Sequence, residues 1–151
     1  MSIFEAIRNG DVDQLKTVIE TTPSSLISTD ERGSTPLVLA SYLGSMEATK
    51  LLVEAGAELN TCGMTGTALM GVCFKGYAEI ASYLIGAGAN IDATHANGST
   101  ALTFAAMFNK VEIVKLLLEK GADAGAKDVN GLTAADHARS KGFVEVVGVL
   151  A

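Results

Sequence analysis

The sequence repeats itself with a period of 33 residues, and this period constrains the fold more than any other feature. Thr67, Thr100 and Thr133 are spaced by 33 residues, and Thr35 precedes Thr67 by 32. A unit of this length is too short to bury an apolar core by itself, so successive units have to stack against one another. The spacing therefore predicts an elongated stack of similar units.

A second set of marker residues shows where the repeat is interrupted. Gly88 and Gly121 are 33 residues apart, whereas Gly56 precedes Gly88 by only 32. Both markers place the missing residue between Gly56 and Thr67. We therefore expect a shortened loop close to Met64, with the helices on either side unchanged.

Each unit carries the signals of a short helix, a tight turn, a second helix and a polar loop. In the second unit Thr35 can cap the first helix, and Pro36 follows at the first helical position. Gly44 ends that helix, and Asn109 takes the equivalent position in the fourth unit because asparagine tolerates a left-handed cap. Second helices such as 111–120 show apolar residues at helical spacing before a glycine.

The apolar residues that fill the core are predominantly small. Hydrophobic residues make up 48% of the chain but aromatic residues only 5%, and Trp is absent. Closely packed helices suit such a composition. The residues predicted for the core of one unit are Leu37, Leu39, Ala40, Leu51 and Leu52.

These motifs resemble the ankyrin repeat. The resemblance lies in Gly-x-Thr-Pro-Leu at 33–37 and in EIVKLLLEKGAD at 112–123, with related segments at 79–90 and 47–60. It implies an all-α solenoid of paired antiparallel helices joined by short β-hairpin-like loops. We expect one domain, 1–151, with an N-terminal cap at 1–29, repeats at 30–62, 63–95 and 96–128, and a C-terminal cap at 129–151.

The chain departs from the family pattern at two positions of the repeat. The family's proline is replaced at Ala68, Ala101 and Ala134, and its histidine at Val38, Met70, Thr103 and Asp136. We expect these changes to loosen the hydrogen bonding between repeats. The terminal units depart further, with Ser2 and Glu5 as a capping box at the start and Asp136, Arg139 and Lys141 exposed at the end.

Charge and composition argue against several function classes. A net charge of −6 and a pI near 4.8 would repel a nucleic-acid backbone. The longest near-apolar run, 101–108, is far shorter than the roughly 20 residues that span a bilayer. With no signal-peptide pattern at the start and two unpaired cysteines, Cys62 and Cys73, we expect a cytoplasmic protein.

The sequence shows no constellation typical of catalysis or metal binding. The two histidines, His95 and His137, lie without a nucleophile or acid at useful spacing. We therefore expect neither an enzyme nor a protein that needs a metal or cofactor.

The positions that stacking leaves free are the candidates for function. The resemblance implies a concave surface lined by the ends of the first helices and by the loop tips. An aromatic stripe at helical spacing can also belong to a core, but the leucines already fill this one, so we expect these side chains to face solvent. The candidates at the helix ends are Tyr42, Leu43, Phe74, Lys75, Met107 and Phe108, and those at the loop tips are Glu31, Arg32, Met64, Asn97 and Asn130.

Two functional hypotheses follow. The first is a non-catalytic module that binds a partner protein through the concave face, as an adaptor, scaffold or inhibitor. The alternative is a structural or self-associating unit that uses its apolar terminal face at Val149 and Leu150. Under the first hypothesis we expect a monomer.

Overall fold

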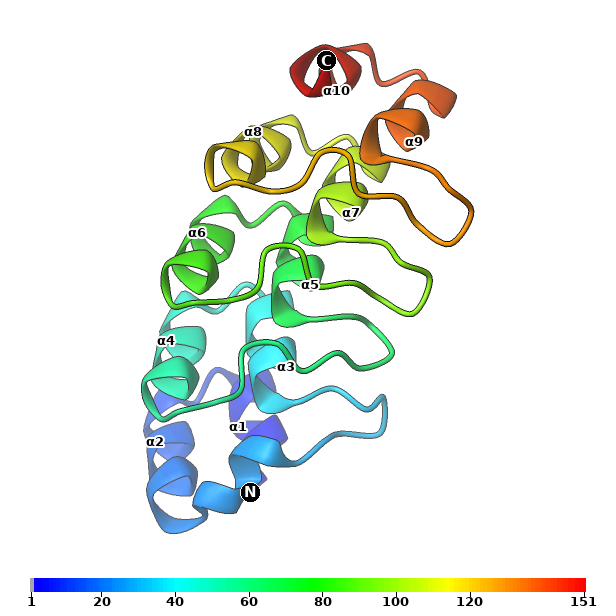
Figure 1. The fold of residues 1–151 in the computed structure, drawn as a ribbon. Coiled ribbons are helices and arrows are strands. Elements are labelled where there is room, and N and C mark those ends of the chain that lie inside the picture. The colour runs from blue at the N-terminus through cyan, green and yellow to red at the C-terminus, as the bar shows by residue number, and fades with distance from the viewer. Residues whose placement is uncertain (1) are drawn as a thin grey trace.

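Paired antiparallel helices stack side by side in the computed structural model, which describes residues 2–151 (Figure 1). The inner layer consists of α1 (Ile3–Asn9), α3 (Pro36–Tyr42), α5 (Ala68–Lys75), α7 (Ala101–Met107) and α9 (Ala134–Ser140). The outer layer consists of α2 (Val12–Thr21), α4 (Met46–Glu54), α6 (Ala78–Gly86), α8 (Val111–Glu119) and α10 (Val144–Leu150), and a short 3-10 helix, η1 (Pro23–Ile27), follows α2. The predicted all-α solenoid is confirmed.

The stack curves toward the side that carries the inner helices and the long loops between pairs (Figure 1). We call this side the inner face, and it corresponds to the concave face that the resemblance implies. The tips of the four long loops, which we call finger loops, span 30–34, 63–66, 95–99 and 128–132. Of the residues that the structure describes, no helix is long and apolar enough to cross a membrane.

A threonine hydroxyl caps the start of four inner helices. In α3 the Thr35 hydroxyl accepts from the Val38 N–H at 3.3 Å, and Pro36 follows at the first helical position as predicted. The same bond forms at α5, α7 and α9, from Thr67, Thr100 and Thr133. Asn109 adopts φ 58°, the left-handed conformation expected after α7. The repeating threonine therefore sets where each inner helix begins.

The residues that replace the family's histidine complete this cap in three repeats. The backbone N–H of the capping threonine donates to Met70 Sδ at 3.4 Å, to Thr103 Oγ1 at 3.1 Å and to Asp136 Oδ2 at 2.9 Å. These side chains thus bond within their own repeat. The Asp136 side chain is 39% exposed, so its predicted exposure holds only in part, whereas Arg139 and Lys141 are exposed as expected.

Neighbouring repeats are joined by hydrogen bonds in the loops that follow the outer helices. The Asn90 N–H donates to Asn60 Oδ1 at 2.7 Å, and the Asp123 N–H donates to Asp92 Oδ1 at 3.0 Å. A further bond joins two finger loops, from the Val129 N–H to the Asn97 carbonyl at 3.0 Å. The repeats are therefore linked by backbone donors at regular intervals along the stack.

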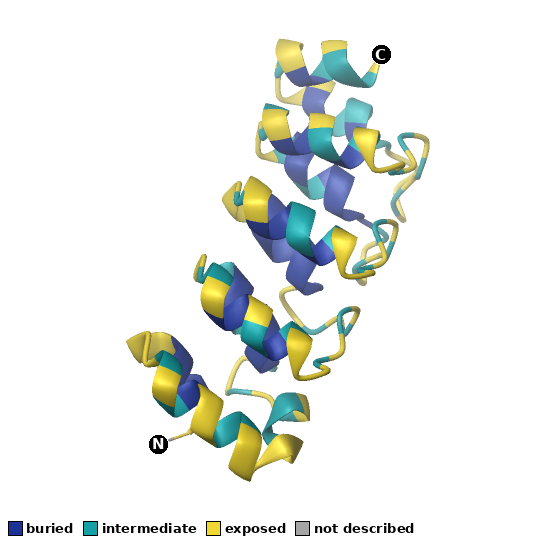
Figure 2. Ribbon diagram, turned by 90° about the vertical axis from the view of Figure 1, so that its left-hand side faces the viewer, coloured by how far each residue is buried: buried dark blue, intermediate teal, exposed yellow. Residues whose placement is uncertain are grey.

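Small side chains form the centre of the core. Ala40, Val72, Ala105 and Ala138 occupy the same position of successive inner helices, and each is fully buried. Figure 2 shows the outer helices with their exposed residues on the side away from this core. The composition therefore correctly indicated a core of small residues.

The core prediction holds for Leu37, Ala40 and Leu52, which are buried, and in part for Leu39 and Leu51, which are half-buried and pack against the core. Leu39 lies one residue before the buried Ala40, and one residue turns a helix by about 100°. Its side chain consequently lines a pocket on the inner face.

The residue missing between Gly56 and Thr67 lies at the tip of a finger loop. The other loops close through a bond that spans five residues, such as Asp30 N–H to the Ser34 carbonyl and His95 N–H to the Ser99 carbonyl. Here Gly63 and Gly66 pair with each other across only Met64 and Thr65. A Cβ at Gly63 would lie 2.8 Å from the Gly33 carbonyl oxygen, so the close approach of these two finger loops needs glycine at this position.

We expect Thr100→Ala to lower the free energy of unfolding by about 1–2 kcal/mol, because Thr100 is buried and its removal leaves the Thr103 N–H without its acceptor. Urea denaturation followed by circular dichroism measures the loss. Thr65→Ala, at an exposed finger tip, is the control and should change stability by less than about 0.5 kcal/mol. Equal stability of the two variants would contradict the role of the cap.

Candidate functional site

Three aromatic rings from successive repeats meet at the ends of the inner helices. The centroids of Tyr42 and Phe74 are 6.4 Å apart with nearly parallel planes, at 9°. The Phe74 and Phe108 centroids are 4.6 Å apart and the rings meet edge to face, at 83°. We call these three residues the aromatic ladder. It runs across α3, α5 and the end of α7 as one connected surface.

Most of the predicted helix-end residues are exposed. Leu43, Phe74 and Phe108 are 49%, 37% and 39% exposed, and Lys75 is also exposed. Tyr42 and Met107 are half-buried, so the expectation that they face solvent holds for only part of each side chain. For Tyr42 the reason is that Phe74 and Lys75 lie against its ring.

Lysine side chains lie over the rings of this ladder. The Lys75 Nζ is 5.1 Å from the centre of the Tyr42 ring and 6.0 Å from that of Tyr77. The Lys141 Nζ is 5.3 Å from the centre of Phe108. A cation at this distance is attracted to the face of an aromatic ring. The ladder is therefore an apolar strip with positive charge along it.

Two pockets lie next to each other along the inner face, and Tyr42 and Thr65 line both. The larger has a volume of about 320 Å³ and extends to Glu31 and Arg32 at the first finger tip. At this end Arg8 forms ion pairs with Asp30 at 3.2 Å and Glu31 at 3.3 Å. The smaller, of about 190 Å³, lies between the aromatic side chains of α3, α5 and α7. One end of the inner face is thus charged and the middle apolar.

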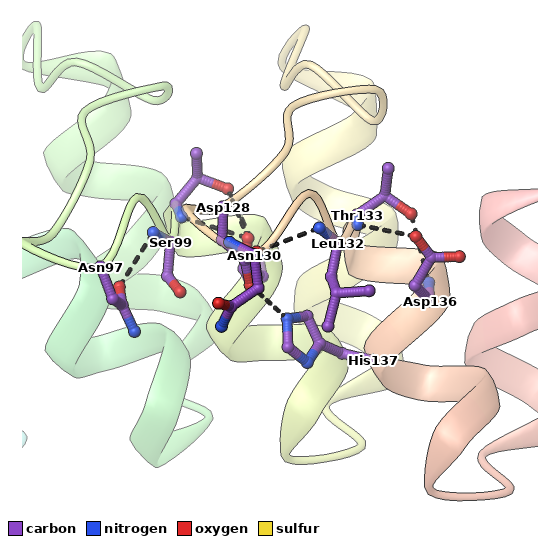
Figure 3. Close-up of polar contacts among 10 residues, drawn as sticks. Asn97, Ser99, Asp128, Asn130, Leu132, Thr133, Asp136 and His137 are labelled. Atoms are coloured by element: carbon purple, nitrogen blue, oxygen red, sulfur yellow. Dashed lines mark hydrogen bonds and ion pairs between the residues drawn. The ribbon is translucent and has the colours of Figure 1, made fainter.

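The five finger-tip candidates, Glu31, Arg32, Met64, Asn97 and Asn130, are all exposed. Met64 is 82% exposed at the shortened tip. Asn97 also has a structural role, since its Oδ1 accepts from the Ser99 N–H at 3.0 Å (Figure 3). The finger tips are therefore accessible, and Glu31 and Arg32 line the larger pocket together with Tyr42 of the ladder.

Asp128 organises the last finger loop, a role that sequence reasoning missed. Its Oδ1 accepts from the Asn130 and Leu132 N–H groups, and its Oδ2 lies 2.7 Å from His137 Nε2 in α9 (Figure 3). The hydrogen bond with His137, followed by the bond from Leu132, holds the pKa of this carboxyl below its ordinary value of 3.8. The equivalent position in the first finger loop is Asp30, and this recurrence of aspartate was the available signal.

His95 has a comparable structural role at the shortened finger. Its Nε2 lies 3.1 Å from the Met64 carbonyl oxygen, and its ring meets Phe104 edge to face at 6.1 Å. Both histidines thus form hydrogen bonds with finger loops. Within residues 2–151 no three His, Cys, Asp or Glu side chains come together in a way that would hold a metal ion.

The two cysteines differ in their surroundings. Cys62 is exposed next to the shortened finger, and Cys73 is buried in α5. Burial raises the pKa of the Cys73 thiol to about 12, so it remains protonated at neutral pH. Cys73 therefore contributes to the core as a small apolar residue.

Comparison with known proteins agrees with this architecture. The family model described as "Ankyrin repeats (3 copies)" matches residues 3–95 and 69–151, and the chain belongs to the ankyrin-repeat family. Repeats of this family are protein-interaction modules.

Several curated relatives share these repeats. The chain is 40% identical over 96 residues to human protein phosphatase 1 regulatory subunit 27, which covers 63% of this chain and 62% of that protein. It is 33% identical over 109 residues to rat ankyrin repeat and SAM domain-containing protein 6, covering 71% of this chain and 12% of that protein. For BRCA1-associated RING domain protein 1 of Caenorhabditis elegans the identity is 34% over 111 residues, covering 72% and 16%. The chain thus matches less than two thirds of the length of each relative.

We expect Asp128→Asn to destabilise the protein at neutral pH and to lose this effect in acid. Because the folded pKa of Asp128 is lowered, its carboxylate contributes stability above its ordinary pKa of 3.8, and this contribution disappears as the pH falls through the folded value. Thermal midpoints of both proteins between pH 7 and pH 2 should therefore converge at the acidic end.

The matched control is Glu119→Gln at the exposed end of α8, which should follow the wild type at every pH. A constant difference between Asp128→Asn and the wild type across this range would contradict the assignment.

Proposed function

We propose that this chain is a non-catalytic module that binds a partner protein through its inner face and acts as an adaptor, scaffold or inhibitor. The observation that carries the proposal is the aromatic ladder, which places Phe74 and Phe108 partly exposed and in contact with each other. Contiguous exposed apolar surface marks interaction sites on soluble proteins. Aromatic side chains near the centre of an interface also supply much of its binding energy.

The ladder is suited to binding because its rings are held before a partner arrives. Tyr42 stacks on Phe74, which in turn meets Phe108 edge to face. Side chains fixed in this way lose little rotamer freedom when a complex forms, and such losses otherwise reduce affinity. At about 2 kcal/mol each, three such anchors supply roughly 6 kcal/mol, which corresponds to a dissociation constant of tens of micromolar.

The rest of the proposal concerns the whole chain. We propose that 1–151 acts as a single binding domain without catalytic activity, because His95 and His137 support loops and the Cys73 thiol stays protonated. A cytoplasmic location fits two free thiols. The name of the human relative, a regulatory subunit of protein phosphatase 1, supports a regulatory role through binding.

The alternative, self-association through the terminal face, rests on α10. Val144 is 81% exposed there, whereas Val149 and Leu150 are half-buried against the core. Val149 and Leu150 thus present only part of their side chains to a second copy, and we expect a monomeric mass by light scattering. A dimeric mass that Val144→Asp returns to the monomer would favour the alternative.

We expect the double variant Phe74→Ala, Phe108→Ala to weaken partner binding at least about thirtyfold, since truncating one anchor costs roughly 2 kcal/mol. The measurement is a pull-down from a lysate of the source organism, followed by titration of the captured protein. Circular dichroism should show that the variant keeps its helices.

The matched control is Ile27→Ala, Val144→Ala, which removes two exposed apolar side chains outside the ladder. A partner retained equally by the wild type and the Phe74, Phe108 variant would move the binding site away from the ladder. Loss of binding by the control variant alone would point to η1 or to the terminal face.

A further inference from the structure

A glycine interrupts the row of side chains that the inner helices present on the inner face. The fourth position is Leu39 in α3, Phe104 in α7 and His137 in α9, but Gly71 in α5. This position lies one turn before the ladder residue Phe74 and therefore on the same side of the helix. Glycine in a helix interior is destabilising relative to alanine. Gly71 thus costs stability at the centre of the candidate binding surface.

The backbone does not require glycine at this position. Gly71 has an ordinary helical φ, and a methyl group added to it would have Tyr42 Cδ2 as its nearest neighbour, at 3.4 Å. That distance is an ordinary van der Waals contact. The absence of a side chain at Gly71 instead leaves open space above α5.

This space is the smaller pocket, which we call the Gly71 pocket. It has a volume of about 190 Å³ and is lined by Tyr42, Thr65, Met70, Phe74 and Phe104 in addition to Gly71. A cavity of about 150 Å³ lined by apolar side chains takes up benzene. The Gly71 pocket therefore has the size and the lining for one leucine, methionine or phenylalanine side chain.

Positive charge borders this pocket. The Lys75 Nζ lies 5.1 Å above the ring of Tyr42, which forms one wall, and Lys141 lies over Phe108 at the far end of the ladder. Neither lysine forms an ion pair within 4.0 Å in the described part of the chain. The sequences of α3, α5 and α7 contain no acidic residue. Although the chain carries a net charge of −6, this strip is positive.

The acidic residues nearest in the chain belong to the outer layer. Glu79 and Glu145 follow these lysines but lie in the first turns of α6 and α10, where a helix dipole favours negative charge. They leave the lysines available to a partner. Positive charge beside an exposed aromatic strip is complementary to carboxylates that flank an apolar side chain.

We propose that the partner contributes a peptide segment with one bulky apolar side chain, which enters the Gly71 pocket, and with acidic residues beside it, which pair with Lys75 and Lys141. This inference rests on the proposed function and specifies the chemistry of the partner.

The test is a selection from a phage-displayed library of random 12-residue peptides on the wild-type protein. Enriched peptides are then synthesised and titrated against variants. We expect them to combine Asp or Glu with a leucine, methionine or phenylalanine.

Gly71→Leu fills the pocket with a good helix former, so it should raise the thermal midpoint and weaken binding at least tenfold. Lys75→Glu with Lys141→Glu should weaken binding roughly tenfold at low salt, and less at high salt.

Matched controls make the same changes in the outer layer. Gly86→Leu adds a leucine at the exposed end of α6, where open space surrounds the position, and Lys50→Glu with Lys120→Glu reverses two exposed charges. Both controls should bind the selected peptides like the wild type. Lys50 is a close match because its Nζ also lies over a ring, that of Tyr83, at 5.8 Å.

The outcomes separate this inference from the proposed function. Peptides that bind Gly71→Leu like the wild type but lose affinity for Phe74→Ala, Phe108→Ala would overturn the pocket and keep the binding surface. Selected peptides without acidic residues would overturn the predicted chemistry alone. If the selection yields no peptide that depends on Phe74 and Phe108, the binding surface and the pocket both fail.

Discussion

Close packing between neighbouring inner helices is the constraint on which the other features depend. It is possible because Ala40, Val72, Ala105 and Ala138 occupy equivalent buried positions, where a larger side chain would hold the helices apart. The threonine caps fix where each of these helices starts, so that equivalent positions stay in register. As a result the helix ends of adjacent repeats approach closely enough for Phe74 to touch both Tyr42 and Phe108.

The inner face combines this regular scaffold with a few irregular features. Stacking positions the ladder, and three departures from the repeat give the surface its individual character: the shortened finger at Gly63–Gly66, the glycine at Gly71 and the unpaired lysines. The first two meet at one place, because Thr65 of the shortened finger lines the pocket above Gly71. Such departures are where a repeat protein acquires specificity, since the scaffold itself is shared by proteins with different partners.

Helix periodicity explains both the success and the errors of the sequence predictions for this surface. Phe74 and Phe108 were expected at solvent-facing helix ends and are partly exposed there. Leu39 was assigned to the core, but it is only half-buried there and also lines the larger pocket. Gly71 drew no attention, since an absent side chain has meaning only when the neighbours that surround the space are known. The role of Asp128 was missed as well, because it depends on a partner, His137, that lies nine residues further along the chain.

The sequence by itself determined the class of fold, the start of each inner helix, the left-handed turn at Asn109 and the interval that lacks one residue. These features are local, because capping, helical spacing and turn chemistry act over a few residues. Only the tertiary structure decided how Phe74 meets Tyr42 and Phe108, how the Gly71 pocket forms between three repeats and which lysines of residues 2–151 have no carboxylate within 4.0 Å. These depend on side chains roughly 30 residues apart in the chain, whose distances follow from the packing of neighbouring repeats and not from any local pattern.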